Sequence, residues 1–393
     1  MNSVSTSTAR HGLVDALRGL ALFGILIVNL EFIASDPNHG WNEFTGTTDL
    51  IGRWIGITFF QLKSYLVFAL LFGYGVALMS RPRAGQRFAP RYLRRMLLLF
   101  VVGVFHAVFF FVGDILVTYA ILGTALLAVC RWSDRRLMRL AAWLYAGAVV
   151  VVVLVAVAIA VSPPEATGSS SVYATGSSLE VARERIEMLP VALLVIGVLN
   201  WLSIAATFCV GIVLGRSDVL SNPARHLAAA RRAARACLPL GFGLCGVAGV
   251  LILSGDERTV GMGPAVGLVL ENVGGPIAVV GVVAGVIVAS QRCWWRPVER
   301  GLTPGGSSSL SAYIGESVIA SFVFCGYGFG LIGDIGPLGI LLVAVAIYAT
   351  LEVCARLWLC RYRQGPLEWL LRSVTYWRPQ ALRRSTPVAS DAP

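Results

Sequence analysis

Ten long apolar runs, separated by clusters of charged residues, constrain this chain more than any other feature of its sequence. A helix that crosses the hydrocarbon of a bilayer needs roughly 20 apolar residues at about 1.5 Å rise each. Only 13% of the residues are charged, against about 25% in soluble domains. We therefore predict an all-α polytopic integral membrane helix bundle with about ten transmembrane helices. The runs cover residues 17–33, 55–78, 96–112, 115–129, 140–161, 191–214, 238–253, 264–289, 310–329 and 338–357.

The arginines alternate between the two sides of these runs. They are dense in the loops at 81–95, 131–139, 216–235 and 292–300 and in the tail after residue 360, and sparse in the loops between them. Positively charged loops remain in the cytoplasm, which places both termini there and makes the number of spans even. The net charge of +11 thus reflects the positively charged cytoplasmic loops. We expect this chain to be embedded in a lipid bilayer and not to bind nucleic acid.

The loops and tails offer little room for a soluble catalytic domain. We predict short cytoplasmic tails at 1–12 and 378–393 around a single transmembrane domain at 13–377. The longest outer loop, 162–189, is rich in Pro, Gly and Ser, which predicts a flexible linker, and we expect its last part, 179–188, to be a short helix at the membrane surface. The chain has no Walker or dinucleotide fingerprint. Its eight cysteines never form C-x-x-C and are interpreted as packing residues, so we expect neither disulfides nor a metal site.

Ionisable residues inside the apolar runs are candidate functional residues, because they are expensive in hydrocarbon. Lys63 is the most conspicuous, since the other basic residues of the loops are arginines. Lys63 is either a substrate or proton site, a snorkelling ammonium, or half of an ion pair with a carboxylate such as Glu31. Glu271, Glu316 and Glu352 are expected to face the interior of the bundle.

His106 and Asp114 are two further candidates. A neutral imidazole in mid-span can act as a general base or an acyl acceptor, or it can donate a hydrogen bond between helices. Asp114 comes eight residues later, about 12 Å along a helix axis, so the two cannot form a hydrogen-bonded pair within one helix. Asp114 follows Gly113 in a predicted tight outer hairpin, where its carboxylate is expected to cap the next helix.

Several stretches of the chain resemble a known family. They are residues 15–29, with Arg18 and Asn29, then 71–75, 106–107, 113–123, 326–328 and 365–376. These motifs resemble the bacterial YeiB-like membrane proteins, which are similar in turn to membrane acyltransferases such as heparan-alpha-glucosaminide N-acetyltransferase and the bacterial O-acyltransferases of sugars. In those relatives an acyl group passes from cytoplasmic coenzyme A to an acceptor at the far face. This implies a multi-pass protein of a bacterial plasma membrane.

The resemblance also implies roles for individual residues. The bacterial O-acyltransferases have an arginine, ten residues and then a histidine, whereas here Arg18 is followed after ten residues by Asn29. The loop His39-Gly40-Trp41-Asn42 is similar to a His-x-x-Trp-Asn loop of the heparan enzyme but is one residue shorter. His39 is an alternative to His106 as the catalytic imidazole, although an exposed loop histidine is usually idle.

We expect a membrane acyltransferase that moves an acyl group from coenzyme A to a small or envelope-linked acceptor. His106, His39 and Asp114 are the catalytic candidates. The donor's phosphates are expected at four arginines, which membrane topology alone would also explain: Arg18, Arg91, Arg94 and Arg95. The alternative function is a small-molecule transporter, with its site among the intramembrane polar residues Lys63, Asn29, Glu271 and Glu316. A third reading is a non-catalytic membrane partner.

Overall fold

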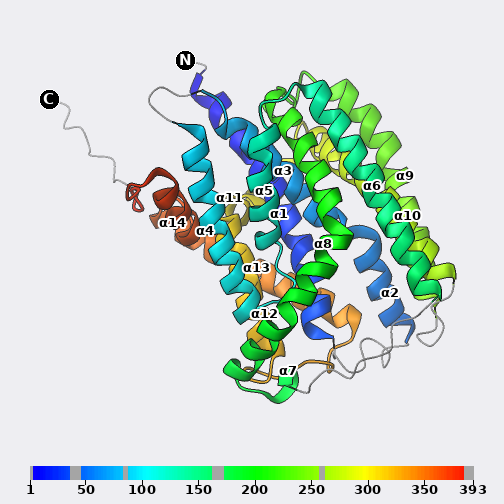
Figure 1. Cartoon of the computed structure of the whole chain (residues 1–393). Helices are drawn as coiled ribbons and strands as arrows, with labels where there is room; N and C mark the ends of the chain where they lie inside the picture. The colour runs from blue at the N-terminus through cyan, green and yellow to red at the C-terminus, as the bar shows by residue number, and fades with distance from the viewer. Residues whose placement is uncertain (1–2, 36–45, 83–86, 162–171, 256–261, 385–393) are drawn as a thin grey trace.

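The computed structural model describes residues 3–35, 46–82, 87–161, 172–255 and 262–384 (Figure 1). Within this part of the chain the regular structure is helical, apart from one isolated bridge between Tyr362 and Arg383. The helices are α1 (Ser3–Ala34), α2 (Thr47–Ile55), the π-helix η1 (Gly56–Phe60), α3 (Lys63–Met79), α4 (Phe88–Phe109), α5 (Leu116–Val129), α6 (Asp134–Val161), α7 (Val172–Thr175), α8 (Ser178–Arg216), α9 (Leu227–Leu253), α10 (Met262–Ala289), α11 (Trp295–Ser307), α12 (Ser309–Phe324), α13 (Pro337–Arg361) and α14 (Pro366–Tyr376).

Ten of these segments correspond to the ten predicted spans. In the described residues, eight segments are long and apolar enough to cross a membrane, and two shorter apolar helices, α5 and α12, complete the set. The prediction of a polytopic helical membrane protein is therefore confirmed. Sequence reasoning missed the helices α11 and α14, because each is short and amphipathic rather than continuously apolar.

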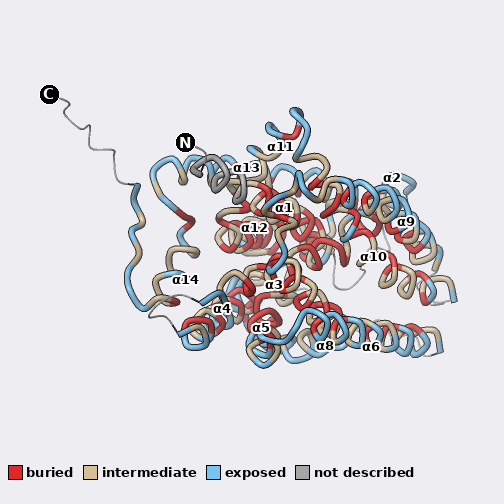
Figure 2. The backbone as a smooth tube through the Cα atoms, turned by 90° about the horizontal axis from the view of Figure 1, so that it is seen from above, coloured by how far each residue is buried: buried red, intermediate tan, exposed pale blue. Residues whose placement is uncertain are grey.

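Helix α1 lies at the centre of the bundle, in contact with α3, α11, α12 and α13. Figure 2 shows buried residues concentrated in these central helices. The neighbouring α3 and α8 approach closely through small residues: a Cβ atom on Gly73 would lie 2.2 Å from the Phe208 carbonyl oxygen. Such close contact is the usual way helices associate in lipid.

Large apolar side chains cover the outside of the bundle. Trp143 is 78% exposed, Leu97 65% and Leu342 68%. A surface of this kind is disfavoured in water and favoured in hydrocarbon. The bundle therefore presents a lipid-facing surface.

The outer segment differs from the sequence prediction. Residues 162–171 lie outside the described part, but the expected surface helix at 179–188 is wrong as a separate element, because it forms the first turns of the 39-residue helix α8. Its Arg185 is buried and donates hydrogen bonds to the Phe109 carbonyl at 2.5 Å and the Cys325 sulfur at 3.4 Å. Helix α7 lies on the side of the molecule opposite α14 and the beginning of α1 (Figure 1).

Candidate functional site

A short turn after α4 brings His106 and Asp114 together. Helix α4 ends at Phe109 and α5 begins at Leu116, so the chain reverses and the His106 Nδ1 atom lies 2.7 Å from Asp114 Oδ2. The separation of about 12 Å holds only along one continuous helix. The predicted hairpin at Gly113-Asp114 removes Asp114 from the helix of His106, so the two residues pair across the turn and not within one helix.

Asp114 also has the capping role that the sequence predicted. Its Oδ1 atom accepts a hydrogen bond from the backbone N–H of Val117 at 2.8 Å, in the first turn of α5. The Tyr313 hydroxyl donates to Asp114 Oδ2 at 3.4 Å. The buried Asp114 carboxylate thus contacts the first turn of α5, the His106 imidazole and the Tyr313 hydroxyl.

His106 has one ring nitrogen engaged and one free. When Asp114 is ionised it can only accept a hydrogen bond, and this contact then places the ring proton on Nδ1 and the lone pair on Nε2. That Nε2 atom is fully buried and has no hydrogen-bond partner within the described chain. The Tyr313 ring lies beside the imidazole, with centroids 4.8 Å apart. A carboxylate that orients an imidazole with a free second nitrogen is an arrangement suited to general-base chemistry.

A cavity of about 620 Å³ leads from the arginine-rich side toward this pair. Its polar end carries three guanidinium groups, those of Arg18, Arg95 and Arg372. Its walls are mainly apolar and aromatic, and its lining includes Ile115 and Tyr313, next to the His106–Asp114 pair. His106 does not line the cavity, whereas Tyr313, whose ring lies beside the imidazole, does. Arg95 and His106 are eleven residues apart on α4, or about 16 Å along its axis.

The four predicted arginines divide into two groups. Arg18 and Arg95 line the cavity, and Arg18 also pairs with Asp15 at 2.8 Å. Arg91 and Arg94 do not line it, and they pack on α14 instead. The Arg91 guanidinium lies over the Tyr376 ring, and Arg94 donates to a carbonyl of α14 at 3.4 Å. These two arginines position α14, which carries Arg372.

Helix α14 is fixed to the base of α12 by Glu368. Its Oε1 atom accepts from the backbone N–H groups of Leu310 at 2.6 Å and Ser311 at 3.2 Å, and its Oε2 atom accepts from the Ser311 hydroxyl. This capping interaction holds the stretch 365–376 against the first turn of α12. Sequence reasoning did not place Arg372 in the site, although it follows Glu368 by one helical turn and so shares its face.

A second polar cluster surrounds Lys63. Its ammonium donates to the Ile57 carbonyl at 2.7 Å and lies 3.6 Å from Glu271 Oε1. The suggested pairing with Glu31 is therefore corrected, because the partner is Glu271 on α10. Glu316 is buried on α12, and neither carboxylate oxygen has a hydrogen-bond partner in the described residues.

The remaining candidates do not join either cluster. His39 lies outside the described residues. Asn29 is half-buried near the end of α1. Among the described residues, no group of three or more His, Cys, Asp or Glu side chains could hold a metal ion. None of the cysteines, all eight of which are described, forms a disulfide.

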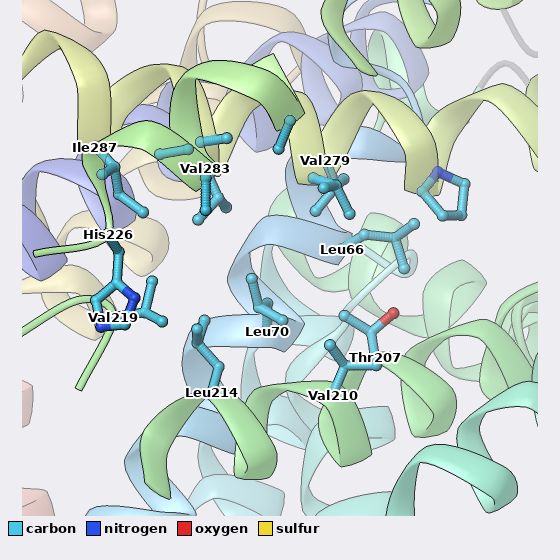
Figure 3. Close-up of a pocket in the computed structure, with 16 residues that line it drawn as sticks. Leu66, Leu70, Thr207, Val210, Leu214, Val219, His226, Val279, Val283 and Ile287 are labelled. Atoms are coloured by element: carbon cyan, nitrogen blue, oxygen red, sulfur yellow. The ribbon is translucent and has the colours of Figure 1, made fainter. Parts of the chain in front are cut away.

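A separate apolar cavity of about 360 Å³ lies among α3, α8, α9 and α10 (Figure 3). Its walls include Leu70, Val210 and Val283, and His226 is the ionisable residue that lines it. The His226 Nε2 atom is already bonded to Asp218 at 2.6 Å. The lining of this cavity includes neither the His106–Asp114 pair nor a guanidinium group.

Comparison with known proteins identifies relatives over nearly the whole chain. Residues 214–378, which include α9 to α14, match the family described as "Protein of unknown function (DUF418)". The chain is 29% identical to the uncharacterized protein YxaH of Bacillus subtilis (strain 168), over 96% of this chain and 97% of that protein. It is 25% identical to the uncharacterized protein YeiB of Escherichia coli (strain K12), over 97% and 98%. No solved structure matches. The predicted resemblance to the YeiB-like membrane proteins is thus confirmed: the chain is similar to two uncharacterized bacterial proteins over nearly its whole length and matches the DUF418 model over residues 214–378.

Proposed function

We propose that this protein is an acyltransferase of the bacterial plasma membrane that takes its acyl group from coenzyme A. The observation that carries the proposal is the alignment of three elements: a basic cavity mouth, an apolar passage and a buried His–Asp pair at its inner end. The resemblance to membrane acyltransferases points to the same chemistry. The acceptor is a small or envelope-linked molecule.

The mouth of the cavity has the charge that an anionic donor needs. Arg18, Arg95 and Arg372 surround it, and guanidinium groups bind phosphate oxygens with forked, charge-assisted hydrogen bonds. Asp15 compensates part of the charge of Arg18, while both oxygens of Glu368 are engaged in capping α12. The phosphates of coenzyme A fit this end, and the thioester arm fits the apolar walls.

His106 supplies the base in this proposal. Its Nε2 atom takes the proton of the acceptor's nucleophile, which attacks the thioester carbonyl carbon, and the carbon–sulfur bond breaks as coenzyme A leaves with its thiol protonated. Asp114 holds the imidazole in the required tautomer and stabilises the imidazolium. Because His106 does not line the cavity, whereas Tyr313 beside it does, the Tyr313 side chain must move for the thioester to reach the base.

Binding measurements on the purified protein in lipid nanodiscs test the donor site. Arg18→Ala, Arg95→Ala and Arg372→Ala should each weaken acetyl-coenzyme A binding by roughly tenfold to a hundredfold, since each removes a contact worth about 1.5–3 kcal/mol. Arg231→Ala is the control, because Arg231 is an exposed arginine of α9 that does not line the cavity. Equal affinity in all four variants would remove the cavity from the proposal.

Turnover measurements test the base. His106→Ala should bind acetyl-coenzyme A like the wild type and lose release of the free thiol in native membranes that supply the acceptor. His39→Ala is the comparison, since the related heparan enzyme has a histidine in a similar loop. An active His106→Ala with an inactive His39→Ala would move the chemistry to that loop. Full activity in both variants would reject a histidine mechanism.

A further inference from the structure

The second span is broken in the middle of the membrane. The segment Thr47–Met79 is long enough to cross it, but its helix changes to the π-helix η1 at Gly56–Phe60 and stops at Gln61. Leu62 then adopts φ 64° and ψ −49°, a conformation that is unfavourable for a side chain other than glycine. π-helical turns and strained residues occur mostly at functional sites, and broken spans form the ion sites of many transporters.

Side chains replace the backbone hydrogen bonds that the break removes. The Lys63 ammonium donates to the Ile57 carbonyl at 2.7 Å, and the Ser64 hydroxyl donates to the Phe60 carbonyl at 2.8 Å. Lys63 therefore sits midway along the span with its charge directed at the end of η1. Its second contact is Glu271 on α10.

The Lys63–Glu271 pair is incompletely satisfied. The side chains are 3% and 4% exposed, and the ammonium nitrogen lies 3.6 Å from Glu271 Oε1, which is longer than a hydrogen bond. Within the described chain that oxygen has no hydrogen-bond partner. A buried ion pair offsets its desolvation only when additional hydrogen bonds satisfy both groups. Glu271 Oε1 is thus a buried acceptor atom with capacity for a proton.

Other ionisable groups face this pair from the surrounding helices. Glu271 interacts electrostatically with Glu31 of α1 and Tyr65 of α3, and Cys245 of α9 with both members of the pair. Arg53 of α2 faces Glu31, and Tyr145 of α6 faces Tyr65. Glu31 is half-buried near the end of α1, and Arg53 is half-buried in the last turn of α2, next to η1.

A hydrogen bond also links this cluster to the cytoplasmic cavity. The Tyr119 hydroxyl donates to the Tyr65 carbonyl at 2.7 Å, and Tyr119 lines the cavity with the arginine mouth. The Lys63–Glu271 pair is therefore placed between polar groups near the outer face and a cavity that opens on the arginine-rich side.

We propose that Lys63 and Glu271 form a proton-binding site at the middle of the membrane. The Glu271 carboxylate takes up one proton from the outer side and becomes a neutral carboxylic acid, so the charge of the pair changes from zero to +1. Protonation removes the attraction that holds Lys63 next to α10, which leaves the ammonium bound to the end of η1. Proton uptake is in this way coupled to the position of the helix break. The site is independent of the proposed acyl transfer.

Infrared spectroscopy of the full chain in nanodiscs tests this site directly. As the pH is lowered from about 9 to about 4, a range that covers ordinary and buried glutamates, the carboxylic acid C=O absorption of one buried group should appear. Glu271→Gln should abolish this change. Glu316→Gln, which alters another buried glutamate in a membrane helix, should leave it intact. Lys63→Met should move its midpoint upward by about one pH unit or more, since an opposite charge is lost.

The same experiment contains the outcomes that overturn the proposal. If the wild-type spectrum shows no carboxylic acid signal over this range, the pair is a fixed ionic contact and the site does not exchange protons. A signal that persists unchanged in Glu271→Gln belongs to another residue and refutes the assignment. Glu271→Asp provides a second variant that keeps a carboxyl group, and its signal should remain with a shifted midpoint. The wild-type measurement decides between exchange and a fixed pair even if a variant fails to fold.

Discussion

Substitution of Asp114 separates its two structural roles. Asp114→Ala removes the cap on α5 and the bond to His106, and it leaves the imidazole buried without its partner. Asp114→Asn keeps a side-chain oxygen that can accept from the Val117 N–H, but it replaces the charged acceptor of His106 by a neutral amide. The two variants should therefore differ in stability, while both should impair any chemistry that depends on the orientation of the imidazole.

The magnitudes follow from these contacts. Loss of a helix cap costs about 1 kcal/mol, and a buried hydrogen bond to a charged group contributes about 1.5–3 kcal/mol, although hydrogen bonds between membrane helices average only about 0.6 kcal/mol. Asp114→Ala should accordingly lower the free energy of unfolding by about 2–4 kcal/mol. Asp114→Asn, which keeps the cap, should lower it by about 1–2 kcal/mol.

Denaturation of the purified variants in mixed micelles measures both changes. Gly103→Ala provides an independent check, because a Cβ atom there would lie 2.8 Å from Asp114 Oδ1, whereas Gly243 has nothing within 4 Å of its Cβ position and Gly243→Ala is the matched control. Gly103→Ala should destabilise the protein and Gly243→Ala should not. Equal losses in Asp114→Ala and Asp114→Asn would show that the cap contributes nothing, and no loss in either variant would refute the buried pair.

Three further predictions concern the two ends of the bundle. Glu368→Ala should lower the unfolding free energy by about 1–2 kcal/mol through loss of the α12 cap, and the same denaturation assay should show less effect for Glu368→Gln. Arg185→Ala should cost about 1.5–3 kcal/mol, since it removes two buried hydrogen bonds of a charged group, and Arg185→Lys should not restore both; wild-type stability in Arg185→Ala would contradict the contacts. Cys293 is exposed and Cys325 is buried, so a maleimide should label Cys293 and leave Cys325 unmodified; rapid labelling of both would disprove this arrangement.

The helices were predictable from the sequence to the extent that they are continuously apolar. Each predicted span must satisfy its backbone inside the membrane, which only a helix does here, and this reasoning located all ten. This reasoning did not predict helix α14, because Glu368 and Arg372 interrupt its apolar character. The capping role of Glu368 depends on α12, which lies more than fifty residues earlier in the chain. Only tertiary contact could reveal that dependence.

The site was predictable by residue type but not by pairing. Lys63 and His106 were identifiable because ionisable groups are rare in hydrocarbon. Their partners were not, since Glu271 is more than two hundred residues from Lys63 and the His106–Asp114 pair requires the turn after Phe109. Helical spacing governs only residues within one helix, so it excluded a pair within one helix but could not predict the pair that forms across the turn.

The surroundings of His106 bear on how an acyltransferase could work across a membrane. On the cavity side, Tyr313 covers the imidazole and is bonded to Asp114. On the other side, Arg185 donates to the Phe109 carbonyl and the Ser321 hydroxyl to the Phe110 carbonyl, which ties α8 and α12 to the end of α4. Under the proposed function, donor and acceptor arrive from opposite sides of the membrane. A base that is closed off from both sides excludes the water that would otherwise hydrolyse the thioester. Opening at Tyr313 would admit the donor and opening at the Arg185 contacts would admit the acceptor, so the two closures belong to separate steps of one reaction.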